Sequence, residues 1–449
     1  MTSFHPTDVH ARLGDLFYVE VDAAQFEPVA LRYRNDQALS SIGLSHVDDA
    51  FLEKHFLQFD PFEGSLKRPL ALAYHGHQFR HYNPDIGDGR GFLFAQAYDQ
   101  HDRLLDMGTK GSGQTPFSRS GDGRLTLQGG VREILAAGML EQRGVYTSKA
   151  LVLFETTDRL DRHDEPSPTR AGVLTRLSHS HIRIGTFQRL AALGAHEEIG
   201  ALIDHCLTHY LTEEDYSAKA DEGKAIIMFR KTVSRMAWLV AEWMAAGFVH
   251  GVLNTDNLTI TAESFDYGPF RFLERYEPGF TAAYFDQTGL YAYARQPEAV
   301  GWALARFAEC LMPHASLDGL QAELNLFAGL YKHAWLTQHL MLAGLAPNVI
   351  NIEKLSSEVL ASIQEHQGPF VDLHNHLRKE FAKHPNVKEI REGAHRMVPM
   401  HHGIVEDIWA PIHENDDWQT FDDFVSEKFQ RPRSSLRADV AGAPPSSSN

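Results

Sequence analysis

The stretch 74–154 constrains the fold most strongly, because it alternates short apolar runs with glycine-rich loops. Residues 92–98 and 104–110 have the composition of strands, and the polar segment between them predicts a hairpin turn. A helical pattern follows, with apolar residues recurring on one face and Gly144 as the expected C′ residue. Residues 149–154 then predict a third strand.

Two charged residues occupy defined places in this order. Lys110 ends the second strand, and Glu133 lies in the early turns of the helix. An ion pair between them would hold the ammonium where it can meet the α- or β-phosphate oxygens of a nucleotide. The alternative is two surface charges that never meet. The order of strand, strand with terminal lysine, helix with early glutamate, and strand resembles a protein-kinase N-lobe and favours the ion pair.

The middle of the chain has helical periodicity. Residues 184–207 predict one or two helices, and residues 225–246 predict a long helix that ends at Gly247. A polar loop follows this helix directly, which again is the order found in protein kinases. Residues 298–383 are mostly helical in pattern and would supply the body of a second lobe.

These elements predict an α+β, protein-kinase-like two-lobed fold. The β-rich N-lobe is expected at residues 1–185 and carries the glycine-rich loops. The mostly helical C-lobe is expected at residues 186–430 and carries the catalytic and metal loops. The last stretch, 431–449, is rich in Ser, Pro, Ala and Arg with little to bury, so we expect a mobile tail.

The segment 250–270 has the layout of a metal-nucleotide site. Asp256 and Asn257 are neighbours on a polar loop, and Asp266 follows the apolar stretch 258–261, which predicts a hairpin that folds back. Three oxygen ligands would then converge. Hard oxygen ligands are what Mg²⁺ takes when substrate phosphates complete its shell. The alternative is structural, because Asp-Asn and Asp-Tyr-Gly are also ordinary turn sequences.

Three glycine-rich loops, at 86–91, 110–113 and 121–124, add candidate phosphate contacts. Glycine lets backbone N–H groups approach phosphate oxygens, and an arginine in the loop adds a bidentate contact. A single loop of this kind is more often a turn, but three around a Lys and Glu pair favour a nucleotide site. Arg176 and Arg183 would suit a phosphate chain, although without further context such residues are more often surface salt-bridge partners.

Composition restricts the classes of function. With 449 residues, a formal charge of −17 and a pI near 5.8, the chain lacks the basic footprint that nucleic acid or an anionic membrane requires. Cys206 and Cys310 have no metal-type spacing, so neither a disulfide framework nor a zinc site is indicated. No signal-type N-terminus and no apolar run of about eighteen residues occurs. We expect a cytoplasmic protein with neither nucleic acid nor membrane as partner.

Short motifs stand in a fixed order across residues 13–312. They are Gly76-His-Gln-Phe79, Gly87-Asp-Gly-Arg90, Lys110-Gly-Ser-Gly113, Thr115-Pro-Phe-Ser-Arg119, Gly121-Asp-Gly-Arg124, Arg132-Glu133, Ser180-His-Ile-Arg183, the stretches His250–Asn257 and Asp266–Phe270, Tyr291-Ala-Tyr293 and Gln296-Pro297. The ordered set resembles the selenoprotein O family. Members of that family are pseudokinase-like proteins that transfer AMP from ATP to protein hydroxyls. Small departures accompany it, at His75, at Arg80 and after about Pro385.

The resemblance implies a role for each matched residue. Asp256 would accept the proton of the attacking hydroxyl, and Asn257 and Asp266 would hold Mg²⁺ or Mn²⁺. ATP would be inverted relative to a kinase, so that its α-phosphorus faces the acceptor. The implied ATP contacts are Gly87, Gly89, Arg90, Lys110, Asp122, Gly123, Arg176, Arg183 and Asp266.

The leading hypothesis is therefore a metal-dependent protein adenylyltransferase with ATP and protein Ser, Thr or Tyr hydroxyls as substrates. Two alternatives remain open: a γ-phosphoryl kinase and a non-catalytic ATP-binding scaffold. The kinase is disfavoured because Asp256 is adjacent to Asn257, whereas the kinase loop places its catalytic Asp five residues before the metal-binding Asn. The scaffold ranks lower because every polar residue needed for catalysis is present.

Overall fold

A computed structural model of the chain describes residues 3–162, 166–212, 222–348, 352–395 and 397–429, so the predicted tail lies outside the described part. Within these residues nine strands form one antiparallel sheet in the order β2, β4, β7, β8, β11, β10, β3, with β1 beside β7 and β9 beside β11. The strands are β1 (His5–Thr7), β2 (Tyr18–Glu20), β3 (Pro28–Arg34), β4 (Leu70–Leu72), β7 (Leu93–Tyr98), β8 (Leu104–Lys110), β9 (Leu125–Thr126), β10 (Lys149–Leu160) and β11 (Thr169–Ser178).

Both faces of the central strands are buried. Along β10, Leu153 joins the hydrophobic cluster that contains the helices, while Val152 and Phe154 join a second cluster on the opposite face. Successive side chains of a strand point to opposite faces, so a strand covered on both sides reads as a continuous apolar run. The second cluster is covered by α1 (Asp36–Ser41) and α2 (Asp49–Phe56).

Helix α3 (Leu127–Gln142) packs on the other face, against β10 and β11. The Thr126 side chain caps its N-terminus by accepting a hydrogen bond from the Gly129 N–H. At its C-terminal end Gly144 has a φ of 79°, a left-handed conformation that glycine adopts readily. The strand, strand, helix, strand order predicted for residues 92–154 is therefore confirmed.

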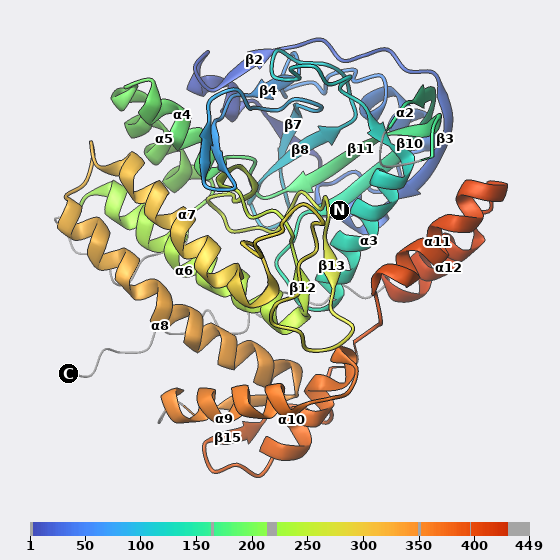
Figure 1. Cartoon of the computed structure of the whole chain (residues 1–449). Helices are drawn as coiled ribbons and strands as arrows, with labels where there is room; N and C mark the ends of the chain where they lie inside the picture. Colours follow the sequence, from blue (N-terminus) through green and yellow to red (C-terminus); the bar gives the residue numbers. More distant parts are fainter. Residues whose placement is uncertain (1–2, 163–165, 213–221, 349–351, 396, 430–449) are drawn as a thin grey trace.

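The helical part of the molecule lies below the sheet in Figure 1 and is built around the long neighbours α6 and α8. Helix α6 ends as predicted, because Gly247 follows it with a φ of 65°. The described helices of this part are α4 (Ile184–Ala192), α5 (His196–His209), α6 (Lys224–Ala246), α7 (Gln296–Leu311), α8 (Leu317–Leu342), α9 (Ile352–Glu365) and α10 (Leu373–Phe381), with the strand pair β14 (Leu345–Pro347) and β15 (Val387–Glu389).

The predicted hairpin at 258–261 is wrong. The strand pair of this region is instead formed by β12 (Phe248–Val249) and β13 (Arg271–Phe272). The apolar residues Leu258 and Ile260 exchange backbone hydrogen bonds with 182–184, at 2.9 and 3.0 Å. Their apolar character therefore reflects pairing with a distant segment. This pairing fixes the loop that carries Asp256 against the start of α4.

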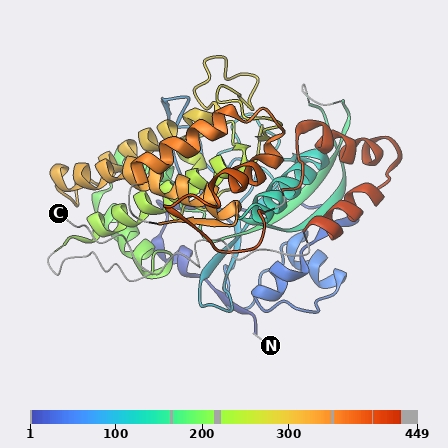
Figure 2. The same cartoon turned by 90° about the horizontal axis from the view of Figure 1, so that it is seen from below.

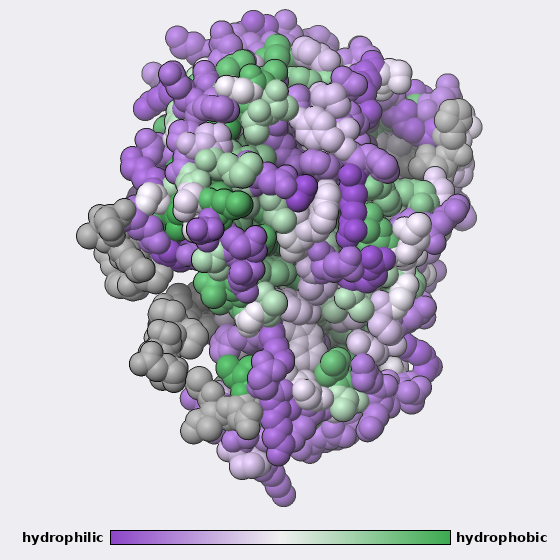
Figure 3. All heavy atoms as spheres, turned by 60° about the vertical axis from the view of Figure 1, so that its left-hand side comes forward, coloured by the Kyte–Doolittle hydropathy of each residue, from purple (hydrophilic) through white to green (hydrophobic). Residues whose placement is uncertain are grey.

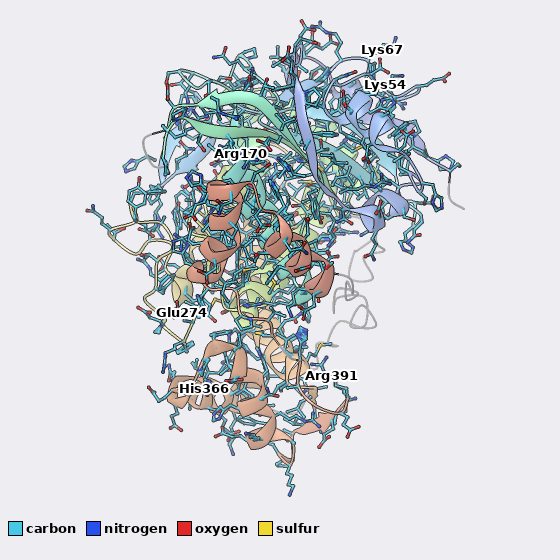
Figure 4. All side chains as sticks on the ribbon, turned by 90° about the vertical axis from the view of Figure 1, so that its right-hand side faces the viewer. Lys54, Lys67, Arg170, Glu274, His366 and Arg391 are labelled. Atoms are coloured by element: carbon cyan, nitrogen blue, oxygen red, sulfur yellow. The ribbon has the colours of Figure 1, made fainter. Side chains whose placement is uncertain are left out.

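Two C-terminal helices, α11 (His402–Asn415) and α12 (Gln419–Lys428), lie beside α3 at the right of Figure 1. In Figure 4 Arg170 is seen where these helices meet the sheet. Arg170 and Arg32 both bind the buried Glu155, each with a contact at 2.7 Å, and both also contact Asp416 between the two helices. These ion pairs attach the C-terminal helices to the sheet.

The surface of the molecule is mainly hydrophilic on the face shown in Figure 3, with scattered apolar patches. Among the described residues, none of the helices combines the length and the apolarity needed to cross a bilayer. Cys206 and Cys310 are buried free thiols.

The sheet and helices described above make the architecture a mixed α/β fold with one large antiparallel sheet and many helices.

We expect Glu155→Ala to lower the free energy of unfolding by about 3–5 kcal/mol, because it leaves two half-buried arginines without their buried carboxylate. Equilibrium unfolding in urea measures the change. The control is Asp8→Ala, which removes an exposed pair with Arg12 and should cost less than about 1 kcal/mol. Equal losses in the two variants would contradict the role assigned to Glu155.

Candidate active site

A cavity of about 930 Å³ lies between the glycine-rich loops and the loop that follows β12. Its volume is in the range of sites that bind small molecules and cofactors. The structure brings every predicted site residue to the lining of this one cavity. They are Gly87, Gly89, Arg90, Lys110, Asp122, Gly123, Glu133, Arg176, Arg183, Asp256, Asn257 and Asp266.

Two of the cations enter the cavity from neighbouring strands. β8 and β11 pair with Lys110 opposite Leu174 and with Arg176 opposite Gly108. Residues two apart on a strand share a face, so Lys110 and Arg176 project from the same face of the sheet. Helix α3 packs on that face and supplies Glu133.

Lys110, Arg176 and Arg183 form a buried group, here called the cation cluster, around two carboxylates. Lys110 Nζ forms an ion pair with Glu133 and lies 2.8 Å from Asp266 Oδ1. Arg176 Nη1 lies 2.9 Å from Asp266 Oδ1 and 3.8 Å from Glu133 Oε2, and Arg183 Nη2 lies 3.7 Å from Asp266 Oδ2. The alternatives that treated these residues as surface charges are therefore wrong.

Asp266 is the common partner of the whole cation cluster. Burial alone would raise the pKa of Asp266, but the attraction of Lys110, Arg176 and Arg183 outweighs burial and holds the pKa well below its usual range. The residue has a φ of 64°, a left-handed conformation that Asp tolerates better than most residues. Asp266 is thus a permanent carboxylate presented from a tight turn.

Asp256 has the opposite electrostatic environment. Burial raises the pKa of Asp256 to about 6, and a backbone hydrogen bond and Arg183 counteract this only in part. Its Oδ1 is buried and has no hydrogen-bond partner among the described residues. Arg183 Nε donates to the Asp256 backbone carbonyl at 2.9 Å, which fixes the loop while leaving the carboxylate available. A carboxylate with this pKa can accept a proton near neutral pH.

The hairpin of β5 (Gly76–Gln78) and β6 (His81–Asn83) packs directly on Asp256. A Cβ at Gly76 would lie only 2.8 Å from Asp256 Oδ1, so a side chain there would crowd the carboxylate. The His77 N–H donates to the buried Thr255 hydroxyl at 2.7 Å, and that hydroxyl donates to the Gln188 side chain at 2.6 Å. The backbone on both sides of Asp256 is therefore held.

Asn257 and Asp266 offer oxygen donors that fit a divalent cation. Asn257 Nδ2 donates to the Val252 carbonyl at 2.9 Å, which leaves its Oδ1 available to a ligand. Together with the unpartnered Asp256 Oδ1, these are hard oxygen donors. No group of three His, Cys, Asp or Glu residues suited to a metal occurs in the described part of the chain. Mg²⁺ does not require one, because it binds through one or two carboxylates when phosphates complete its shell.

The glycine-rich loops pack closely on one another. Gly123 has a φ of 70°, and a Cβ there would lie 2.2 Å from the Gly113 carbonyl carbon. A Cβ at Gly87 would lie 2.4 Å from Cγ of Phe117. Glycine is therefore required at both places, where loop 121–124 packs on Gly113 and loop 86–91 packs on Phe117. Both loops line the cavity.

Sequence reasoning did not assign a role to two cavity residues that bind predicted ones. Arg162 holds Asp122 with contacts of 2.8 and 3.0 Å, from 40 positions away, and no local pattern indicates the pair. Asp88 lies 3.5 Å from Arg183 Nη2 and accepts from the Leu72 N–H. The position of Asp88 between Gly87 and Gly89 was the one feature of the sequence that could have indicated it as a site residue.

Comparison with known proteins agrees with this geometry. The family model described as protein adenylyltransferase SelO matches residues 2–395, most of the chain. The chain belongs to the SelO family. Three relatives are each called protein nucleotidyltransferase YdiU. The Synechocystis sp. protein is 41% identical over 92% of this chain and 96% of its own length. The Trichodesmium erythraeum protein is 40% identical, with the same coverage, and the Gloeobacter violaceus protein is 40% identical over 92% and 93%.

Membership in the SelO family makes the chain a nucleotidyltransferase. The family match includes every residue of the cavity lining and extends past Pro385, where a departure from the family was expected. It ends before α11 and α12. Helix α11 nevertheless reaches the edge of the SelO site, because its Glu406 lies 3.8 Å from Arg132, which lines the cavity beside Glu133.

We expect Asp256→Asn to stabilise this SelO-family protein at pH 8. The pKa of Asp256 is raised in the folded state, so its carboxylate form destabilises the fold as pH rises through about 6. Removing that charge should add roughly 2–3 kcal/mol to the free energy of unfolding. Urea unfolding at pH 8 and at pH 4 measures the gain, which should disappear at the lower pH.

The matched control is Asp266→Asn. The pKa of Asp266 is lowered in the folded state, so the variant should be less stable than the wild type at pH 8. The two substitutions are chemically identical and lie in the same cavity. Changes of the same sign in both variants would contradict the opposite environments described for the two carboxylates.

Proposed function

We propose that this chain transfers AMP from ATP to Ser, Thr or Tyr hydroxyls of proteins. The single observation that carries the proposal is the buried cation cluster beside Asp256, whose pKa is raised and whose Oδ1 has no partner. A triphosphate requires cations that stay charged, and an attacking hydroxyl requires a nearby proton acceptor. The family description as an adenylyltransferase agrees with both requirements.

ATP binding is assigned to the cavity lining. The backbone N–H groups of Gly87, Gly89 and Gly123 would approach phosphate oxygens, with Arg90 and Asp122 at the same wall. Lys110, Arg176 and Arg183 would exchange part of their contact with Asp266 for phosphate oxygens. This exchange keeps each buried cation paired, which avoids the cost of an uncompensated charge.

Asn257 and Asp266 are the proposed ligands of Mg²⁺ or Mn²⁺. Asp266 suits the role because its low pKa keeps it ionised, and Asn257 because its Nδ2 is already engaged with the Val252 carbonyl. The metal ion would add positive charge near the phosphates and so favour the departure of pyrophosphate. Glu133 would not contact it, since Glu133 holds Lys110 in place.

The reaction then proceeds with these residues in separate roles. The acceptor oxygen forms a bond with the α-phosphorus while the bond from that phosphorus to the bridging oxygen breaks. Asp256 takes the hydroxyl proton, and pyrophosphate leaves with the electron pair. Lys110 and the two arginines neutralise the charge that develops on the departing group.

The domain arrangement is part of the same proposal. Residues 1–185 would act as the N-lobe and residues 186–430 as the C-lobe of a protein-kinase-like fold, with the cavity where they meet. The observed Lys110 and Glu133 pair and the turn at Asp266 support it. The neighbouring positions of Asp256 and Asn257 favour AMP transfer over the γ-phosphoryl chemistry of a kinase.

ATP labelled at the α- or at the γ-phosphate distinguishes the candidate activities. With Mg²⁺ or Mn²⁺ and wild-type protein we expect label on protein only from the α-position. Asp266→Ala should lower that signal at least about 100-fold, because it removes a metal ligand and unbalances the cation cluster. Asp22→Ala, at an exposed carboxylate that pairs with Arg68, is the control. Transfer of γ-label would support a kinase and refute the proposal.

AMP transfer should lose rate as pH falls through about 6, because protonation of Asp256 removes the proton acceptor. The measurement is kcat at saturating ATP between about pH 5 and pH 9. Asp256→Asn should lower kcat by about 100-fold or more and abolish the acid limb. A rate that stays constant down to pH 5 would exclude Asp256 as the base.

A further inference from the structure

Phe79, Tyr284 and Phe285 form a small group, here called the aromatic lip, close to the catalytic loop. The Phe79 and Phe285 rings lie 5.8 Å apart, and the Tyr284 and Phe285 rings 5.2 Å apart. Phe79 directly follows Gln78, which lines the cavity beside Asp256. We propose that the aromatic lip docks an apolar side chain that flanks the acceptor hydroxyl of a protein substrate. This inference rests on the proposed function.

Two members of the lip are exposed although they are aromatic, while Phe79 is partly buried. Tyr284 is 88% exposed and Phe285 47% exposed. In Figure 2 the loop after β13, in yellow, projects from the body near the blue hairpin of β5 and β6. Large apolar side chains that stay in water at a defined place are typical of surfaces that bind a partner.

The loop that carries Tyr284 and Phe285 is held rigidly. The buried Asp286 carboxylate accepts from the Leu290 N–H at 2.9 Å and from the Tyr291 N–H at 2.8 Å. The backbone immediately after the two aromatic residues is therefore anchored. A preorganised aromatic group binds a partner at lower entropic cost than a flexible one.

The lip is attached to the catalytic loop through Asn254, two positions before Asp256. The Phe79 N–H donates to Asn254 Oδ1 at 3.0 Å, and the Tyr291 hydroxyl donates to the same oxygen at 2.8 Å. The Tyr291 ring also packs on Phe79, with centroids 5.0 Å apart. The position of Phe79 relative to the loop of Asp256 is thus fixed by a direct hydrogen bond and by the packing of Tyr291.

This attachment identifies the occupant as the acceptor protein. An acceptor whose hydroxyl reaches Asp256 must place its neighbouring residues beside the hairpin of β5 and β6. Residues two or three positions from the hydroxyl extend about 7–10 Å further along the chain. In the hairpin turn, Arg80 is paired with Glu298 at 2.8 Å and lies over Trp302, so its guanidinium is already engaged. An apolar side chain therefore fits the lip better than a charged one.

Synthetic peptides test the proposal on the full-length protein. One peptide carries a single Ser in a background of Gly and Lys, and its partners carry one added Leu at each position within three residues of the Ser. Transfer of α-label measures kcat/KM for each peptide. The wild type should prefer the best Leu peptide by about tenfold, mainly through a lower KM.

The variant combines Tyr284→Ala and Phe285→Ala, and Leu326→Ala on α8, at a residue that is 51% exposed, is the control. The variant should lose the preference for Leu while it keeps the wild-type kcat and the wild-type affinity for an ATP analogue. The control should behave as the wild type. If the double variant keeps the preference for Leu peptides, or if the wild type shows no such preference, the proposed role of the aromatic lip is overturned.

Failure of the underlying function gives a different result. If the wild type transfers no α-label to any peptide or to itself, both proposals fall. If the wild type labels the polar peptide and the Leu peptides equally, only the proposed role of the aromatic lip is refuted. Light scattering measures the oligomeric state and so tests whether a second copy of the chain occupies the aromatic lip. A wild type that is dimeric, together with a double variant that is monomeric, would overturn the acceptor assignment.

Discussion

The contact between Asp266 and the cation cluster is the interaction on which the rest of the site depends. One carboxylate faces Lys110 from β8, Arg176 from β11 and Arg183 from the start of α4. Three buried cations without a counter-charge would be strongly destabilising. Asp266 therefore determines how the sheet, α4 and the loop after β12 can pack together.

The same contact prepares the cavity for an anionic ligand. Cations that are already desolvated and positioned lose little on binding phosphate, whereas mobile surface lysines would have to be ordered first. The C-terminal helices contribute at a distance. Glu406 of α11 lies near Arg132, and Arg132 also donates to the Gly268 carbonyl at 3.3 Å, beside the Asp266 turn. Helices outside the family match thus contact α3, and Arg132 of α3 in turn contacts the turn that carries Asp266.

Local signals in the sequence predicted most helices and strands of this region. Features that depend on contacts between residues far apart in the chain could not be predicted. Helix α3 and strands β7, β8 and β10 follow from periodicity and turn residues, which lie within one stretch of chain. The burial of Arg176 could not be predicted in this way, since its partner Asp266 is 90 positions away. The apolar run 258–261 failed for the same reason, because it pairs with 182–184. The matched motifs predicted the lining of the cavity, but Arg162, Tyr284 and Phe285 lie in no matched motif.

Asp256 and Asp266 lie in the same cavity, and their carboxylates have opposite pKa shifts. Asp256 and Asp266 carry the same functional group, but burial raises the pKa of the first, which Arg183 counteracts only in part, and the cation cluster lowers the pKa of the second. Environments that separate the pKa values of two acids in this way assign proton transfer to one and permanent charge to the other. Removing Arg183 would raise the pKa of Asp256 further, because Arg183 is the cation that lowers it, and it would also remove one of the proposed phosphate contacts. The positions of the three cations, which all lie within 3.7 Å of Asp266, are therefore a requirement of the proposed chemistry as well as of the fold.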